Sequence, residues 1–286
     1  MTLAWTTCLV CVLAFSLHAF EAEHRETREL MAFVEDAAEL VSASGPDGAC
    51  ASFREDRSRW RYEDDYVFIL DMEGNTLCHP AQPRLEGRSI VDLRDPKGKP
   101  IVQMFLRAVE EDDEGWVHYQ WPRPGESTFV WKSTYVKKAT GPTGKSYVVG
   151  SGLYQMPMER DFVVEKVDEA VRLIEQEGTE ALETLRDPAG GFRFYDAYVF
   201  VFDEAGVQHV NAAFPEHEGQ NLLDLEDAEG VVIGREMLDV VRGRGAGWVD
   251  YLWPQPGDTR PSEKSSYVKG VQVGDTLYVV GAGVYF

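Results

Sequence analysis

One phrase occurs twice in this chain, as GWVHYQWPRPG at residues 115–125 and as GWVDYLWPQPG at residues 247–257. The same shift of 132 positions aligns DDYVFILDMEG at 64–74 with DAYVFVFDEAG at 196–206, and KSTYVK at 132–137 with KSSYVK at 264–269. Because the shift is constant and no gap intervenes, the chain is a tandem repeat of one unit. A unit of this length is a complete domain rather than one turn of a solenoid.

Each unit has the residue pattern of an α+β domain. A stretch with helical spacing comes first and meets a helix stop, Gly45-Pro46 in the first unit and Gly178 in the second. β-branched and aromatic strands, turns rich in Asp and Gly, a second helix and three more strands follow. We therefore expect two domains, 27–156 and 160–286, each with a long N-terminal helix packed on a central antiparallel sheet.

The first 22 residues differ from the rest of the chain. Residues 3–20 are apolar and contain no Asp, Glu, Lys or Arg, whereas charged residues are dense from Glu21 onward. This pattern predicts a secretory signal peptide with cleavage after Ala19 or Ala22, or an uncleaved N-terminal anchor, with a buried core helix as the remaining alternative. We therefore expect a periplasmic or secreted protein, which stays tethered to the membrane if the leader is retained.

The cysteines fall into two pairs. Cys8 and Cys11 form a C-x-x-C inside the apolar leader, where redox chemistry is not expected. Cys50 and Cys78 lie in the first unit. In an exported protein they either form a disulfide or pack as two separate buried thiols, and the sequence leaves both alternatives open.

Charge and motifs exclude several classes of function. The formal net charge is −21, which argues against non-specific binding to nucleic acid and against docking on an anionic membrane. The sequence has no H-E-x-x-H, no nucleophile elbow and no paired C-x-x-C motifs for zinc. We therefore expect no catalytic residues, no metal and no cofactor.

Taken together, the phrases YVFILDMEGNTLCHP, GWVHYQWPRPG, KSTYVK and VVGSGLY resemble the single Cache domain of the second type, a sensor module found outside the cytoplasm in bacterial chemoreceptors and histidine kinases. The resemblance covers nearly all of the chain after the leader. It implies two tandem PAS-like domains, each with one pocket for a small organic acid on the face of its sheet. Receptors of this kind continue into a second membrane span and a signalling domain, whereas this sequence stops at Phe286, so we expect a binding protein without its own output domain.

Candidate binding residues come from strand alternation and from the resemblance. Alternation places Tyr119 and Trp121 on one face of their strand and His118 on the other. Lys, His, phenol and indole groups are the donors that a half-buried carboxylate requires. The resemblance puts the Lys and Tyr of KSTYVK and a His of the family near the pocket. The predicted ligand-binding residues are His79, Tyr119, Trp121, Lys132 and Tyr135, with their counterparts Asn211, Tyr251, Trp253, Lys264 and Tyr267. Trp116 and Trp248 are interpreted as structural.

The two copies differ at one predicted ligand position. His79 is replaced by Asn211, and His209, two residues before it in an alternating strand, is a candidate substitute. Gln82 is replaced by Phe214, which makes the neighbouring wall more apolar. We therefore expect the first copy to be the better carboxylate binder.

The function expected from these observations is binding of C2–C4 carboxylates outside the cytoplasm. The ligand signal would pass to a membrane receptor, kinase or transporter. The alternative is a structural or protein-interaction protein with two domains and no small ligand.

Overall fold

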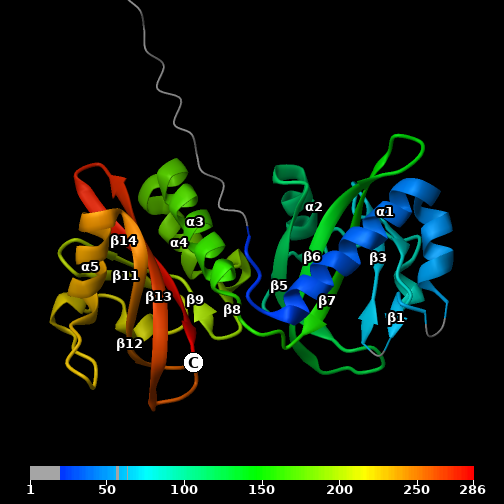
Figure 1. The fold of residues 1–286 in the computed structure, drawn as a ribbon. Coiled ribbons are helices and arrows are strands. Elements are labelled where there is room, and N and C mark those ends of the chain that lie inside the picture. The colour runs from blue at the N-terminus through cyan, green and yellow to red at the C-terminus, as the bar shows by residue number, and fades with distance from the viewer. Residues whose placement is uncertain (1–19, 56–57, 63) are drawn as a thin grey trace, which may run out of the picture.

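The computed structural model describes residues 20–55, 58–62 and 64–286. The predicted leader lies outside these residues except for positions 20–22, and so do Cys8 and Cys11. Within the described ranges, no helix combines the length and the apolar character needed to cross a membrane. Figure 1 shows two modules side by side, each built from helices around one sheet.

The first module runs from α1 to β7. Its two helices are α1 (Arg25–Phe53) and α2 (Ile101–Glu111). Its antiparallel sheet has the strand order β4-β3-β7-β6-β5. The strands are β3 (Phe68–Asp71), β4 (Thr76–Cys78), β5 (Glu114–Pro122), β6 (Phe129–Thr140) and β7 (Ser146–Tyr154). Smaller elements are the ribbon of β1 (Arg61–Tyr62) and β2 (Asp65–Tyr66) and the 3-10 helix η1 (Pro83–Leu85).

The second module repeats this plan from α3 to β14. Its helices are α3 (Arg160–Glu177), α4 (Ala181–Arg186) and α5 (Ile233–Arg244). The sheet order is β11-β10-β14-β13-β12, with β10 (Phe200–Asp203), β11 (Gln208–Asn211), β12 (Ala246–Pro254), β13 (Pro261–Val273) and β14 (Thr276–Tyr285). Shorter pieces are β8 (Arg193–Phe194), β9 (Ala197–Tyr198) and the 3-10 helices η2 (Gly178–Glu180), η3 (Pro188–Gly190), η4 (Pro215–His217) and η5 (Leu222–Asp224).

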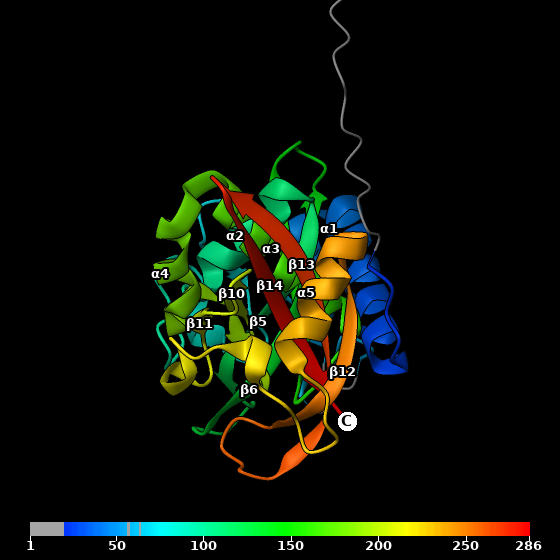
Figure 2. The ribbon, with the colours of Figure 1, turned by 90° about the vertical axis from the view of Figure 1, so that its left-hand side faces the viewer.

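Each sheet lies between helices, so each module has two apolar layers. In the first module, Val41 and Phe53 of α1 pack on one face of the sheet, and Phe105 and Val109 of α2 pack on the other. The second module does the same with α3 and α4 on one face and α5 on the other, and Figure 2 shows α5 lying in front of its sheet. The predicted α+β, PAS-like fold is confirmed.

The first helix does not stop where the sequence predicts. Gly45 has φ 73° and ψ 171°, and Pro46 follows it, but the chain resumes helical geometry and α1 ends at Phe53. The predicted stop is therefore a kink. The segment beyond the kink carries Cys50, which forms a disulfide with Cys78 of β4 at a Cα–Cα distance of 5.8 Å.

The corresponding part of the second module is built without a covalent bond. Gly178, with φ 64°, ends α3 as predicted, and α4 then covers the position that follows the kink in α1. Leu182 of α4 and Val210 of β11 are the counterparts of Cys50 and Cys78 under the 132-residue shift. Both are buried in one apolar cluster.

The modules meet across the outer face of β5. His118 stacks on Phe194 of the second module with ring centroids 4.4 Å apart, and its Nδ1 bonds to Ser133 Oγ at 2.8 Å. The buried Lys99 Nζ donates to the carbonyl of His118 at 3.0 Å and to that of Arg193 at 2.8 Å. Backbone carbonyls of both modules thus accept hydrogen bonds from the same side chain.

Candidate functional site

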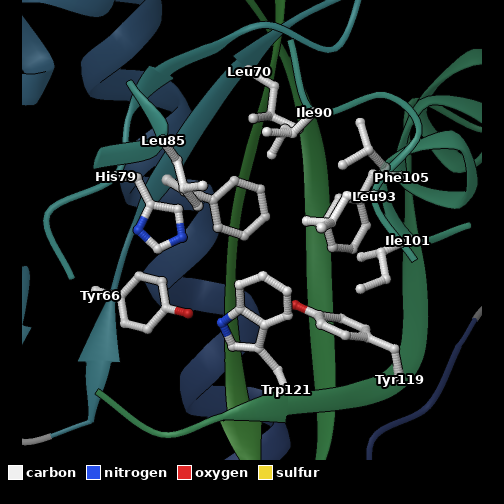
Figure 3. A pocket seen from close by; sticks show the side chains of 12 residues that line it. Tyr66, Leu70, His79, Leu85, Ile90, Leu93, Ile101, Phe105, Tyr119 and Trp121 are labelled. Carbon is white, nitrogen blue, oxygen red and sulfur yellow. The ribbon is translucent and has the colours of Figure 1, made fainter. Parts of the chain in front are cut away.

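A pocket lies between the sheet and α2 of the first module (Figure 3). Its cavity volume is about 30 Å³. One end is apolar and the other carries ring and hydroxyl donors. The lining residues are Tyr66, Phe68, Leu70, His79, Leu85, Ile90, Leu93, Ile101, Val102, Phe105, Tyr119 and Trp121. None of these described lining residues is Asp or Glu.

Lys132 lies directly behind Tyr66 at the polar end of this pocket. Its side chain is 0% exposed, and its Nζ donates to the Tyr66 hydroxyl at 2.8 Å. Burial lowers the pKa of Lys132 to about 7, although Asp65 and Asp64 act in the opposite direction. Lys132 was predicted to contact the ligand directly, but the Tyr66 hydroxyl, not the ammonium group, lines the cavity.

A glycine in the neighbouring strand makes room for the buried lysine. A Cβ on Gly152 would lie 2.9 Å from Cε of Lys132 and 2.4 Å from Oγ1 of Thr134. Both distances are shorter than the non-bonded contacts that a Cβ atom makes in proteins, so no larger residue fits at position 152 without displacing its neighbours. The stem of Lys132 therefore passes through the space that the missing Cβ leaves.

His79 presents a single nitrogen to the pocket. Its Nδ1 accepts a hydrogen bond from the backbone N–H of Gln82 at 3.0 Å. Burial, together with the nearby Lys132, lowers the pKa of His79 to about 3. At neutral pH the ring is therefore uncharged, with its proton on Nε2. Figure 3 shows this ring beside the Tyr66 phenol, and the ring centroids are 4.9 Å apart.

Tyr119 and Trp121 share the pocket face of β5, as strand alternation predicts. Tyr119 Oη bonds to Thr134 Oγ1 at 2.9 Å, so its hydroxyl is already used inside the sheet. Figure 3 shows the indole nitrogen of Trp121 turned toward the Tyr66 hydroxyl. Trp116, on the opposite face, packs against Phe162 of the second module with ring centroids 5.0 Å apart, in line with its predicted structural role.

The second module has a matching pocket of about 20 Å³ between its sheet and α5. Lys264 Nζ donates to the Tyr198 hydroxyl at 2.8 Å, and Tyr251 Oη bonds to Ser266 Oγ at 2.9 Å. Burial lowers the pKa of Lys264, and Asp196 opposes this shift. Unlike Lys132, this lysine lines its cavity. The lining residues are Tyr198, Phe200, Gln208, Asn211, Leu222, Leu225, Ile233, Met237, Tyr251, Trp253 and Lys264.

The structure does not bring Tyr135 and Tyr267 to either pocket. Tyr135 lies on the opposite face of its sheet, packed against Leu30 and Val34 of α1. Tyr267 likewise packs against Trp248, on the face of the second sheet that α3 covers. Because side chains alternate along a regular strand, a residue three positions after Lys132 or Lys264 lies on the other face of the sheet. The prediction that these two tyrosines line the pockets is therefore corrected.

His209 does not replace His79 in the second pocket. A bulge between Val201 and Phe202 shifts the pairing of β10 with β11, so that Gln208 and Asn211 face the cavity together. His209 instead bonds to Asp203 Oδ2 at 2.8 Å. The expected substitution fails because the strand does not alternate regularly at this point.

Tyr66 and Tyr198 are the functional candidates that sequence reasoning missed. Each receives a lysine hydrogen bond and lines its pocket. The signal was present, because both belong to the repeated D-x-Y-V-F phrase. That phrase was interpreted only as a strand.

Comparison with known proteins assigns both modules to one family. The sequence model of the family described as Cache domain matches residues 56–172 and again 163–286. Two curated relatives are a methyl-accepting chemotaxis protein of Pseudomonas putida, 34% identical over 103 residues, and a sensor histidine kinase of Rhizobium johnstonii, 29% identical over 92 residues. The matches cover 36% and 32% of this chain, but only 18% and 19% of those proteins.

Solved structures similar to parts of the chain include two chemosensory domains. A periplasmic sensor domain of a chemotaxis protein is 32% identical, with 47% of this chain and 100% of that chain covered and a TM-score of 0.38. A Cache chemosensory domain described for carboxylic acid recognition is 28% identical, with 46% and 94% covered and a TM-score of 0.37.

Proposed function

Because the chain belongs to the Cache domain family, we propose that its first module is an extracytoplasmic sensor for a small organic acid. The ligand is a C2–C4 carboxylate bound in the pocket between the sheet and α2. One observation carries the proposal: the donors of Tyr66, His79 and Trp121 gather at one end of an otherwise apolar pocket, with the ammonium group of Lys132 directly behind them.

The polar end suits a carboxylate because it offers donors and positive charge. The Nε2–H of His79 and the indole N–H of Trp121 have a donor role only. Lys132 lies one hydrogen bond from the cavity wall, so the ammonium can stabilise an anion at the Tyr66 hydroxyl. A buried anion without such donors would be costly.

The size and the apolar end limit the ligand to a short acid. A cavity of about 30 Å³ has room for about two water molecules, since each needs about 10–15 Å³. Leu70, Ile90 and Phe105 surround the other end, where each buried methylene of a ligand tail contributes about 0.8 kcal/mol. Within the proposed C2–C4 range, acetate therefore needs the least side-chain movement to enter and butyrate the most.

A location outside the cytoplasm is part of this proposal. The Cys50–Cys78 disulfide supports it, because structural disulfides persist in oxidising compartments. The curated relatives are a chemotaxis receptor and a histidine kinase. The proposed partner is accordingly a membrane receptor, kinase or transporter that reads the liganded state.

Thermal unfolding of the full chain tests the proposal. Acetate, propionate, butyrate, lactate and pyruvate are titrated at constant ionic strength, with chloride as the reference anion. A ligand of the native state raises stability by about 2.7 kcal/mol at a concentration of 100 Kd. We expect a saturable rise in Tm with at least one acid and its loss in Lys132→Met.

Lys138→Met is the matched control. Lys138 lies on the same strand β6, and its Nζ contacts Asp113 at 2.8 Å outside the pocket. This variant should keep the full ligand response. A wild-type chain that responds to no acid would favour the alternative of a purely structural protein. An unchanged response in Lys132→Met would remove this lysine from the site.

A further inference from the structure

A glutamate beside each pocket connects a pocket residue to the helical segment on the opposite face of the sheet. In the first module, the backbone N–H of His79 donates to Oε1 of Glu86 at 2.8 Å, and Oε2 of the same carboxylate accepts from the guanidinium of Arg54. His79 follows β4 directly and is 6% exposed. Arg54 follows the last residue of α1, at the end of the segment beyond the kink. One carboxylate therefore links a pocket residue to the end of a helix.

The second module repeats this arrangement with the same residue types. The backbone N–H of Asn211 donates to Oε1 of Glu218 at 3.0 Å, and Nε of Arg186 donates to Oε2 at 3.0 Å. Under the 132-residue shift, Glu218 and Arg186 are the counterparts of Glu86 and Arg54. The two residues before the arginine differ between the copies, Ser-Phe in the first and Thr-Leu in the second. Two helical segments of different sequence thus supply an arginine to the same place.

The loop around each glutamate explains why its carboxylate reaches the strand. A 3-10 helix that begins with proline, η1 or η4, ends one residue before the glutamate. The residue after the glutamate is a glycine with positive φ, 72° at Gly87 and 83° at Gly219, which glycine adopts without steric cost. The N–H of this glycine donates to the carbonyl of Thr76 or Gln208, the first residue of β4 or β11, at 2.8 Å. The loop therefore folds back along the strand and places the carboxylate at the strand end.

The two hydrogen bonds of the carboxylate differ in what they contribute. The side chains of Arg54 and Glu86 are 49% and 19% exposed, and an ion pair with this much exposure adds little to global stability. The bond from the His79 N–H has a local effect, because a backbone donor that loses its acceptor beside the cavity is unfavourable until the chain shifts to find another. The arrangement is therefore suited to holding one residue in place.

We propose that Glu86 is a positioning residue for the first pocket and that Glu218 has the same role in the second. Glu86 holds the backbone of His79 so that its ring lies at the cavity wall, and Arg54 fixes the carboxylate from the helix side. The position of His79 is thereby coupled to the end of α1. The inference rests on the proposed function only where it concerns ligand affinity.

Hydrogen exchange at the His79 amide tests the positioning role without a ligand. The full chain has six histidines, so isotope-labelled histidine gives few amide signals in NMR, and the signal lost in His79→Asn is that of His79. Glu86→Ala should speed exchange of this amide by about tenfold or more, because its acceptor is removed. Glu218→Ala is the matched control and should leave the exchange rate of His79 unchanged.

Two milder variants separate the roles of the two carboxylate oxygens, and they decide the question even where Glu86→Ala folds poorly. Glu86→Gln keeps an acceptor for the His79 N–H but loses the charge-assisted bond with Arg54, and Arg54→Met removes the same bond from the other side. Each should speed exchange by about two- to threefold. The combined variant should match either single variant, because all three remove one interaction.

Calorimetry with acetate connects this role with the first pocket. The measurements use the full chain carrying Lys264→Met, which removes the lysine of the second pocket. Glu86→Ala should weaken acetate binding by about five- to tenfold, because the ring donor of His79 is no longer held at the cavity wall. Glu86→Gln should weaken it by about two- to threefold, and Glu218→Ala should leave it unchanged.

Three results would overturn the inference. These are an unchanged exchange rate of the His79 amide in Glu86→Ala, additive effects of Glu86→Gln and Arg54→Met, and faster exchange in Glu86→Ala with unchanged acetate affinity. A wild-type chain that binds none of the acids refutes the proposed function instead. The exchange rates then still decide whether Glu86 positions His79.

Discussion

The first module ties its N-terminal helix to β4 with the Cys50–Cys78 disulfide, whereas the second module places Leu182 and Val210 at the same two positions. The contact between helix and strand is kept, and only its chemistry differs. The pocket residue His79 follows β4 directly, and its counterpart Asn211 is the last residue of β11. The contact between the helical segment and the strand is therefore present in both modules, as a disulfide in the first and as apolar packing in the second.

The pockets differ in a second way. The lysine–tyrosine hydrogen bond is 2.8 Å in both modules, and the tyrosine–hydroxyl bond within the sheet is 2.9 Å in both. The polar differences lie on β4, β11 and the residues that follow them, where Thr76 and His79 become Gln208 and Asn211. The lysine–tyrosine pair is thus common to both modules, and the donor that His79 or Asn211 adds to the pocket is where they differ.

Removing the disulfide is expected to have the largest effect. Cys50 and Cys78 are separated by 28 positions, and a cross-link of that span stabilises by about 3–4 kcal/mol. Cys50→Ala with Cys78→Ala should lose this amount in urea denaturation. Cys50→Leu with Cys78→Val, which copies the second module, should recover part of it. If both double variants lose the same free energy of unfolding, apolar packing cannot replace the disulfide in the first module.

Binding in the first module should weaken as the pH rises above 7. The pKa of Lys132 is about 7 in the unliganded protein. Above this pH the amine must take up a proton to hold a carboxylate, so affinity falls by about tenfold per unit. Calorimetry from pH 6 to 9 in buffers of different ionisation enthalpy measures both the affinity and the proton uptake.

The ring of His79 does not compete as an explanation of this pH dependence. Its pKa of about 3 leaves it neutral over the whole range.

Ionisation of Lys132 also affects the stability of the unliganded protein. The folded-state pKa of Lys132 lies below its unfolded value of about 10.4, so this contribution to stability increases as the pH rises from 7 to 10 and disappears in Lys132→Met. A ligand affinity that stays constant from pH 6 to 9 would contradict the proposal that protonated Lys132 stabilises the bound carboxylate.

Replacing His79 by Asn, the residue found at position 211 of the second module, should have a smaller effect on ligand affinity. His79→Asn keeps a side chain that can accept the Gln82 N–H, as Asn211 accepts that of Phe214. It replaces a ring N–H by a shorter amide, so the first module should bind its acid about 3- to 10-fold more weakly. Isothermal titration at pH 6 measures this difference. His217→Asn, in the other module, is the control and should leave the first site unchanged.

Tyr119→Phe and Tyr251→Phe should have the smallest effects, and these should be equal. Each removes a hydroxyl that bonds within the sheet, to Thr134 or Ser266, at a cost of about 1 kcal/mol in the free energy of unfolding. Chemical denaturation measures both. Ligand affinity should change little. A large loss of binding in Tyr119→Phe alone would show that this hydroxyl contacts the ligand.

Much of this architecture could be predicted because a repeat with a nearly constant shift indicates two copies of a whole domain. Alternation along β5 correctly separated Tyr119 and Trp121 from Trp116. The same rule, applied to β6, places Tyr135 on the opposite face from Lys132. The wrong prediction that Tyr135 lines the pocket therefore came from the family resemblance, which was preferred to the residue pattern. The orientation of Gln208 could not be predicted, because it follows from a bulge that leaves no clear trace in the residue types. The burial of Lys132 behind Tyr66 depends on packing between strands distant in sequence.

Strand β5 serves two purposes at once. Its odd positions, Tyr119 and Trp121, line the first pocket, while His118 on its other face stacks on Phe194 of the second module. A rigid strand cannot rotate one row of side chains without rotating the other. Any tilt of β5 that accompanies ligand entry is therefore delivered to the neighbouring module through a single backbone, with no loop to absorb it.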